Sequence, residues 1–312
     1  MSIVKTLPTG VSTVSVDGFE VPYRSLGEGK LLLCSELPLN PFARYALLQE
    51  KLASRYRVIV FDLRPVIGRS PSAPPAEDLL GFLSEFSLRF ADALGLDSFC
   101  LAGSFMYGGV AMNVARLAPH RVSGLVLIGP LGIVPGPQSL LMRGIVAFYK
   151  LPGIPFLHRF RICRALVEDL DHGILGPIRL RQIYFDPQVA SVTVEELYEQ
   201  NQTPEYPPAI LALMWAIRKM RYDALVPKLS EIGCPALILH GEQDVWIPIS
   251  YAEDLQRRLT RSTLKVIPKS RHVPEIEQLE LTTQAVEEFL NAVPDVARSS
   301  FLNGERNNAV SG

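Results

Sequence analysis

Four short apolar runs, separated by helix-like segments, constrain the fold of this sequence more than any other feature. They cover residues 57–62 (RVIVFD), 98–102 (SFCLA), 124–128 (GLVLI) and 236–240 (ALILH). Each run is almost continuously apolar rather than alternating, which is typical of a strand buried on both faces. Strands that alternate with helices form a parallel sheet covered by helices on both sides. The sequence therefore predicts an α/β fold with a mostly parallel central sheet.

Weaker patterns extend this alternation towards both ends of the chain. Further strands are predicted at residues 11–16, 20–24, 30–34 and 263–267. The dipeptide Asp17-Gly18 between the first two is a strong hairpin signal. Helices are predicted at residues 44–54, 76–94, 108–117, 251–259 and 282–290.

The middle of the chain has a different character. Between residues 132 and 226 the strand-like runs vanish, and helical pieces rich in Leu, Arg and Tyr lie between prolines. We therefore expect a helical cap at 132–226, inserted between two parts of the α/β core at 1–131 and 227–294. The polar segment 295–312 is expected to be a disordered tail.

The composition excludes several classes of function. The 312 residues include 31 basic and 32 acidic side chains, so the chain lacks the positive charge that nucleic-acid binding requires. The sequence contains no uninterrupted run of 18 apolar residues, the length needed to span a membrane. Its first residues also lack the apolar core of a signal peptide. Four scattered cysteines suit free thiols in a reducing compartment, so a cytoplasmic location is expected. No metal-ligand cluster or nucleotide-binding glycine motif is present, so no cofactor is expected.

Six segments, in order along the chain, resemble the α/β-hydrolase superfamily. They are VDGFEVPYRSLGEGKLLL, RVIVFDLRPVIGRS, LGLDSFCLAGS, RVSGLVLIGP, ALILHGEQDVWIP and SRHVPEIEQLELTTQAVEEFL. The resemblance implies an α/β-hydrolase fold with a helical cap and an active site at the carboxyl ends of the strands. It implies much less about the reaction, because this fold hosts many chemistries.

Two residues stand where the family has its catalytic acid and base. Asp244 follows the strand at 236–240 in a short turn, and His272 follows the strand at 263–267 after a short loop. Loops at the carboxyl ends of parallel strands converge on one crevice, so the two side chains are expected to meet. A carboxylate that accepts the imidazole Nδ1–H leaves Nε2 as a base near neutral pH.

The nucleophile turn departs from the family pattern G-x-S-x-G. The sequence here is AGSFMYGG, residues 102–109. Counting along the flanking segments puts Phe105 at the apex of the turn. Ser104 reaches the apex only after a shift of one residue, and Met106 has the smallest flanking residues but an inert side chain. No alignment of the turn gives both a nucleophile and two small flanking residues.

The oxyanion loop departs as well, because Ser35 and Glu36 stand where the family commonly has His-Gly. A carboxylate at this place would oppose a developing oxyanion, and losing one oxyanion-hole donor costs roughly 3 kcal/mol of barrier. The residues expected to line the substrate pocket are Ser35, Glu36, Phe105, Met106, Tyr107 and Trp246.

These features leave three functions open. The first is an enzyme that acts on a small hydrophobic carbonyl or ester substrate, using the His272–Asp244 pair as general base or acid and no standard serine nucleophile. Lyase, cyclase, elimination or cofactor-free chemistry would suit such a site. The second is a serine hydrolase or esterase with Ser104 as nucleophile, and the third is a catalytically silent binding or scaffold protein. The sequence assigns neither the substrate nor the oligomeric state.

Overall fold

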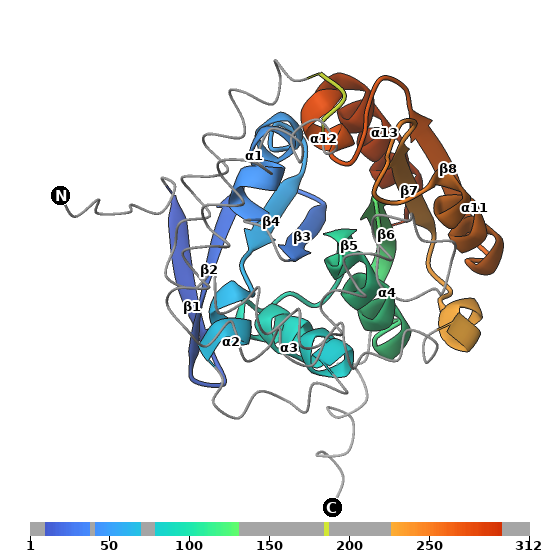
Figure 1. Ribbon diagram of the computed structural model, residues 1–312. Coiled ribbons are helices and arrows are strands. Elements are labelled where there is room, and N and C mark those ends of the chain that lie inside the picture. Colours follow the sequence, from blue (N-terminus) through green and yellow to red (C-terminus); the bar gives the residue numbers. More distant parts are fainter. Residues whose placement is uncertain (1–9, 38–40, 70–78, 131–183, 187–225, 295–312) are drawn as a thin grey trace, which may run out of the picture.

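The fold was analysed in a computed structural model, which describes residues 10–37, 41–69, 79–130, 184–186 and 226–294 (Figure 1). Its strands are β1 (Val11–Val16), β2 (Phe19–Leu26), β3 (Leu31–Leu37), β4 (Arg57–Phe61), β5 (Phe99–Phe105), β6 (Val122–Ile128), β7 (Ala236–Gly241) and β8 (Ser262–Ile267). They form one eight-stranded sheet in the order β1-β2-β4-β3-β5-β6-β7-β8. The pairs β1–β2 and β2–β4 are antiparallel, and all other neighbours are parallel. The predicted mostly parallel sheet is confirmed.

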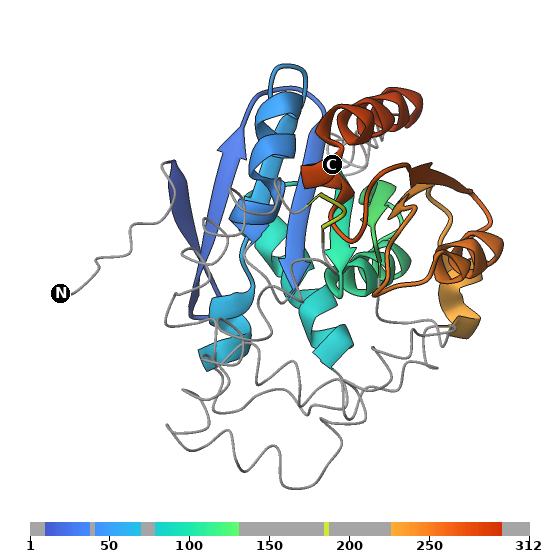
Figure 2. The same cartoon turned by 45° about the horizontal axis from the view of Figure 1, so that its top comes forward.

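Helices cover both faces of this sheet. The described helices are α1 (Pro41–Leu52), α2 (Arg64–Arg69), α3 (Leu79–Ala93), α4 (Tyr107–Leu117), the 3₁₀ helix η2 (Val226–Glu231), α11 (Ile249–Arg258), α12 (Pro274–Glu277) and α13 (Leu279–Ala292). Apolar residues of α1 and α13 form the core on one face, and those of α3, α4 and α11 form the core on the other (Figures 1 and 2).

Burial explains why the central strands read as continuous apolar runs. Every residue of β5 and of β7 is buried, because helices pack on both sides of these strands. The edge strands β1 and β8 keep most of their residues partly or fully exposed. The predicted hairpin is also present: Asp17 and Gly18 have φ values of 50° and 81°, as a tight turn between β1 and β2 requires.

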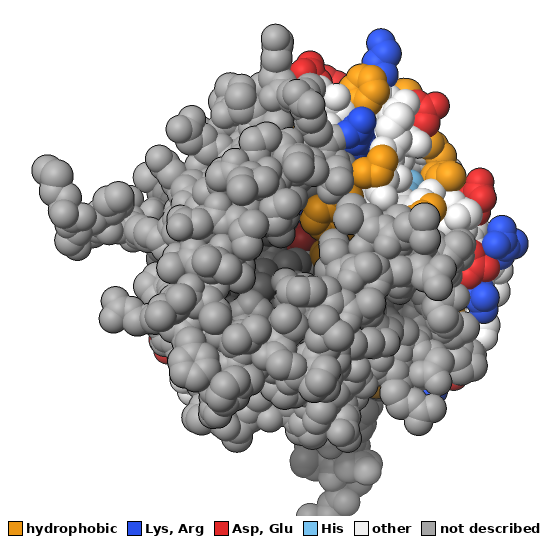
Figure 3. Space-filling view, in the orientation of Figure 1, with side chains coloured by type: hydrophobic (Ala, Val, Ile, Leu, Met, Phe, Trp, Pro, Cys, Tyr) orange, Lys and Arg blue, Asp and Glu red, His pale blue; other side chains and the backbone are white. Residues whose placement is uncertain are grey.

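The structure differs from the sequence prediction in a few places. The segment Arg64–Arg69, for which no helix was predicted, is the short helix α2. The strand predicted at 98–102 continues to Phe105, so the nucleophile turn begins three residues later than the apolar run suggested. The predicted cap, apart from residues 184–186 and 226, and the predicted tail lie outside the described residues and are drawn in grey in Figure 3. Within the described parts of the chain, no helix has the length and apolar character needed to cross a membrane.

Candidate active site

The turn between β5 and α4 has Phe105 at its apex. Phe105 is the last residue of the strand and has a φ of 47°, and α4 begins two residues later at Tyr107. A left-handed backbone costs a non-glycine residue about 1–3 kcal/mol, so it persists only where the surrounding structure enforces it. The apex is thus the strained strand-to-helix position that a nucleophile occupies in α/β hydrolases, and here it holds a phenyl ring.

The packing inside this turn explains why Phe105 takes the apex. A Cβ atom at Gly103, two residues before Phe105, would lie 2.9 Å from the carbonyl oxygen of Tyr107 and 3.0 Å from the Cα of Gly108. Only a glycine fits where the turn approaches its own strand so closely. Neither Ser104 nor Met106 has a glycine two residues before it, so the turn settles with Phe105 at the apex.

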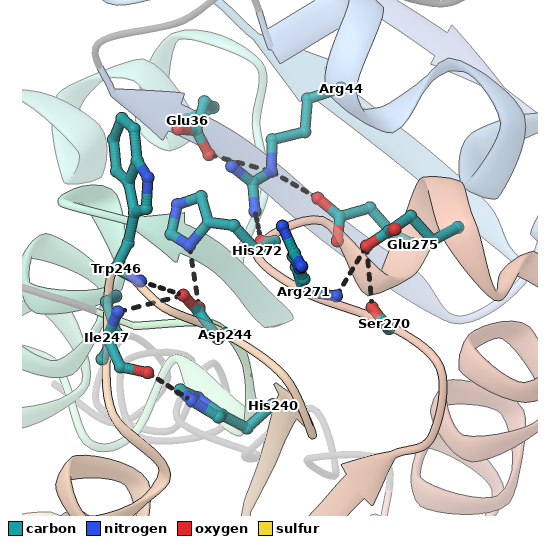
Figure 4. Close-up of polar contacts among 11 residues, drawn as sticks. Glu36, Arg44, His240, Asp244, Trp246, Ile247, Ser270, Arg271, His272 and Glu275 are labelled. Atoms are coloured by element: carbon teal, nitrogen blue, oxygen red, sulfur yellow. Dashed lines mark hydrogen bonds and ion pairs between the residues drawn. The ribbon is translucent and has the colours of Figure 1, made fainter. Parts of the chain in front are cut away.

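The predicted acid and base meet at the carboxyl edge of the sheet (Figure 4). The Nδ1 atom of His272 lies 2.9 Å from Oδ2 of Asp244. The other oxygen, Oδ1, accepts hydrogen bonds from the backbone N–H groups of Trp246 and Ile247 at 2.7 and 3.0 Å. Both side chains are buried, with exposed fractions of 4% and 1%. The carboxylate is therefore held by three hydrogen bonds in one orientation.

These contacts fix the protonation of the pair. Burial raises the pKa of Asp244, but the neighbouring His272 and the bond from the N–H of Ile247 outweigh it and hold this pKa below its usual value. An ionised carboxylate only accepts hydrogen bonds, so Nδ1 of His272 carries the proton and Nε2 is left as the basic atom.

Two aromatic rings enclose the imidazole of His272. The Trp246 ring stacks on it with a centroid distance of 5.4 Å and an interplanar angle of 29°. The Phe105 ring meets it edge-on, at 5.1 Å and 87°, and also contacts Trp246 at 6.4 Å. The base therefore lies in an apolar environment with an aromatic ring where a serine hydroxyl would stand.

Gly241 brings the Asp244 turn and the His272 loop together. A Cβ atom at this position would overlap the backbone carbonyl oxygen of Arg271, and it would lie 2.8 Å from that of Ser270. The same approach allows the N–H of Gln243 to donate to the Ser270 carbonyl at 2.9 Å. Close contact between the loops after β7 and β8 is thus a condition for the pair to meet.

We expect Gly241→Ala to destabilise the protein by about 3 kcal/mol, because backbone atoms rather than a mobile side chain oppose the added methyl group. Chemical denaturation gives this value directly. Gly233→Ala is the matched control, since a Cβ atom there has no atom within 4 Å. Equal stability of the two variants would contradict the close-contact argument.

Ser104, the candidate nucleophile of the serine-hydrolase alternative, lies on β5 before the apex. It is fully buried, and its hydroxyl shares a hydrogen bond of 2.6 Å with the Tyr45 hydroxyl of α1. Among the described residues, no hydrogen bond joins Ser104 to His272. Ser104 therefore contacts the helix layer, whereas Phe105 contacts the base.

The other expected pocket residues are distributed between the core and the site. The Ser35 hydroxyl donates to the Phe61 carbonyl at 2.8 Å, and the Tyr107 hydroxyl donates to Ser87 on α3 at 2.9 Å. Both side chains are thus satisfied inside the core rather than beside His272. Met106 precedes α4 with 7% of its surface exposed.

Glu36 occupies an unusual place beside the pair. It lies in β3 with ordinary strand backbone rather than in a glycine-type conformation, and it forms an ion pair with Arg44 of α1 at 3.4 Å. The Nε atom of Arg44 also donates to Glu275 of α12, and its Nη2 atom donates to the backbone carbonyl of His272 at 3.2 Å. The side chains of Glu36, Arg44 and Glu275 are all almost completely buried.

The sequence patterns did not single out three of the charged residues around the site, although each carries a signal. Arg44 lies on the same buried face of α1 as Tyr45, Leu48 and Leu52. An apolar helix face is an unusual place for a single arginine. Glu275 and Glu277 come shortly after His272 in the sequence, in α12. Glu277 holds the His272 loop by accepting hydrogen bonds from the N–H of Arg271 and the hydroxyl of Ser270 at 2.7 and 3.1 Å. No group of three or more His, Cys, Asp or Glu side chains in the described ranges could hold a metal ion.

Comparison with known proteins agrees with this architecture. The chain is 30% identical over 244 residues to the dihydrolipoyllysine-residue acetyltransferase component of an acetoin cleaving system from Pseudomonas putida, which covers 77% of this chain but only 57% of that relative. It is also 26% identical over 255 residues to a 2-hydroxy-6-oxononadienedioate/2-hydroxy-6-oxononatrienedioate hydrolase from Paraburkholderia xenovorans, covering 77% of this chain and 78% of that one.

A solved structure with the same fold is the 2-hydroxy-6-oxo-6-phenylhexa-2,4-dienoate hydrolase from a Rhodococcus strain. It superposes with a TM-score of 0.71 at 17% identity, over 90% of this chain and 98% of that chain. The sequence profile of the alpha/beta hydrolase fold family matches residues 34–278, which include the sheet from β3 onwards. Because that match extends over more than half of the sequence, this chain belongs to the α/β-hydrolase family.

Proposed function

We propose that this protein is an enzyme that acts on a small hydrophobic carbonyl or ester substrate by general acid–base catalysis at His272, without a covalent serine intermediate. The observation that carries the proposal is Phe105 at the apex of the nucleophile turn, with its ring against the imidazole. An acyl-enzyme needs a hydroxyl within reach of the base. A phenyl ring in that place leaves His272 as the reactive group.

The proposed mechanism uses the His272–Asp244 pair as it stands. With Nδ1–H donated to Asp244, Nε2 can take a proton from a carbon next to a carbonyl, or from water. The carboxylate then stabilises the imidazolium that forms, and the proton returns to the product in a later step. Such proton transfer contributes roughly 10² to 10⁴ in rate, which is sufficient for elimination, cyclisation, lyase or cofactor-free reactions.

The relatives favour a hydrophobic carbonyl substrate. Several of them are named as hydrolases of 2-hydroxy-6-oxo dienoates, among them a 2-hydroxy-6-oxo-6-phenylhexa-2,4-dienoate hydrolase from Burkholderia cepacia. The aromatic rings of Phe105 and Trp246 beside the base suit a substrate of the same apolar character. A cytoplasmic location is part of the proposal, supported by the free thiols of Cys34 and Cys234.

The serine-hydrolase alternative rests on the same relatives, because hydrolases of this fold commonly use a nucleophilic serine. In this chain it would require Ser104 to leave Tyr45 and pass the strand edge to reach His272. The contact of 2.6 Å with Tyr45 and the complete burial of Ser104 both count against that movement. If the protein were a catalytically silent scaffold, no turnover would depend on His272, and this result would distinguish it from both enzymes.

We expect His272→Ala to lower kcat/KM by at least about 10²-fold and Ser104→Ala to leave most of the activity. The measurement is turnover of a panel of aromatic esters and 2-hydroxy-6-oxo dienoates by the two variants and the natural chain. Asp244→Asn removes the charge but keeps the shape of the side chain. We expect it to lower kcat/KM as His272→Ala does. Loss of activity in both His272→Ala and Ser104→Ala would support the serine hydrolase. Full biological activity in both would support the scaffold.

A further inference from the structure

We propose, building on the function proposed above, that Glu36 is a second catalytic group, a neutral carboxylic acid that donates a hydrogen bond to the substrate carbonyl oxygen while His272 removes a proton. Glu36 belongs to a buried cluster with Arg44 and Glu275, and the mechanism at His272 does not use its carboxyl group.

The charges in this cluster do not balance. One guanidinium stands between two carboxyl groups, and the exposed fractions of the three side chains are between 0% and 1%. Two ionised carboxylates would leave a net negative charge without solvent, which is costly in a protein interior. Because Arg44 does not release its proton near neutral pH, one carboxyl group must keep one.

The contacts indicate that Glu36 is the protonated group. Glu275 accepts a hydrogen bond from Nε of Arg44, whereas Glu36 lies at the longer ion-pair distance of 3.4 Å. Both carboxyl oxygens of Glu36 are buried. Glu36 is therefore the less stabilised anion of the two.

The surroundings of Glu36 agree with a neutral acid. Burial raises its pKa to about 8; Glu275 acts in the same direction, whereas Arg44 and a hydrogen bond with the Ser104 hydroxyl act in the opposite one. The other titratable neighbours of this cluster include Tyr45, Cys34 and Tyr184, whose pKa values burial also raises, so all three are uncharged. Glu36 thus keeps its proton below about pH 8 and loses it above.

The carboxyl group is also in the right place. Figure 4 shows it on the side of the His272 ring that faces away from Asp244, which is the side of Nε2. In the sheet, Glu36 pairs with Ser104 and Leu37 pairs with Phe105, so the acid lies one residue from the apex at the same edge.

The proton transfers balance. When Nε2 takes a proton from the carbon beside the carbonyl, the C–H electron pair forms the new carbon–carbon double bond. The carbonyl π pair moves to the oxygen, which accepts the hydrogen bond or the proton of Glu36. A negative Glu36 would repel that oxygen, but a neutral acid attracts it and replaces an oxyanion-hole donor. The sequence-based expectation that Glu36 opposes an oxyanion holds only for its ionised form.

Infrared spectroscopy of the whole protein tests the protonation without a substrate. We expect the band of a protonated carboxylic acid to disappear between about pH 7 and pH 9, and to be absent in Glu36→Gln. Glu277→Gln is the matched control, because the pKa of Glu277 is also raised by burial. A natural chain without this band, or a band that survives in Glu36→Gln and vanishes in Glu277→Gln, would overturn the proposal.

Binding of 4-nitrophenol, whose yellow anion imitates the developing oxyanion, tests the donor role. We expect the affinity for the anion to fall as the pH rises above about 8 in the natural chain and to be independent of pH in Glu36→Gln, which keeps a donor. Glu36→Leu, which has none, should bind at least about 10-fold more weakly. Unchanged binding in Glu36→Leu, with the fold intact by circular dichroism, would refute the donor role. Neither measurement requires turnover, so a failure of the function proposed at His272 is recognised separately.

Discussion

Phe105→Ser should convert this protein into one that reacts covalently with a fluorophosphonate probe, whereas the natural chain should not react. The substitution puts a hydroxyl at the apex, where φ is 47° and where the Phe105 ring lies 5.1 Å from the His272 ring. A serine hydroxyl so close to a base oriented by a carboxylate is activated as a nucleophile. Intact-protein mass spectrometry measures the reaction as the mass of the bound probe.

Two further variants make this result specific. Phe105→Ser combined with His272→Ala should label at least about 10²-fold more slowly, because the hydroxyl then lacks its base. Phe105→Ala should not label at all, although it loses the same buried ring and a similar amount of stability, about 3 kcal/mol. Strong labelling of the natural chain that disappears in Ser104→Ala would contradict the proposed function and support the serine hydrolase.

Arg44→Met should destabilise the protein by about 3–5 kcal/mol, because it leaves two carboxyl groups buried without the cation between them. Arg44 lies 3.4 Å from Glu36, donates a hydrogen bond to Glu275 and holds the backbone carbonyl of His272. Urea unfolding measures the loss. The same change at Arg257, whose side chain is 67% exposed in its ion pair with Asp254, should have little effect.

The loss of stability in Arg44→Met should also depend on pH. The folded chain keeps the proton of Glu36 up to about pH 8, whereas the unfolded chain releases it near the ordinary value of 4.5. The folded state therefore binds more protons over this range, so stability falls as the pH rises from about 4.5 to 8 and then levels off. In Arg44→Met the lowering effect of the cation is absent, so the fall should continue to higher pH. A destabilisation that is equal at about pH 6 and pH 9 would contradict a protonated Glu36.

The fold was largely predictable because its signals are local. Runs such as ALILH can be buried only in a central strand, and Asp17-Gly18 closes a hairpin through its own backbone preferences. The helix α2 was not predicted because its six residues are too few to show a helical period and include Gly68. Burial of Val66 and Ile67 in the core accompanies its formation.

The site was predictable only in part. Counting along the segments around the nucleophile turn put Phe105 at the apex, and the φ of 47° agrees. The Asp244–His272 contact followed from two loops at the same sheet edge. The buried cluster could not be predicted, because Glu36, Arg44 and Glu275 come from β3, α1 and α12 and meet only through the packing of that helix layer. An arginine on an apolar helix face predicts a buried acidic partner but does not show which residue it is.

The contact at Gly241 has a consequence for protein engineering. Asp244, Gly241 and His272 all lie in the segment that contains β7 and β8, whereas the apex residue belongs to β5. The acid and the base are therefore assembled independently of the side chain at position 105. Serine, cysteine or aspartate could be installed there one at a time against an unchanged Asp244–His272 pair, so this chain offers a scaffold in which nucleophiles can be exchanged by a single codon.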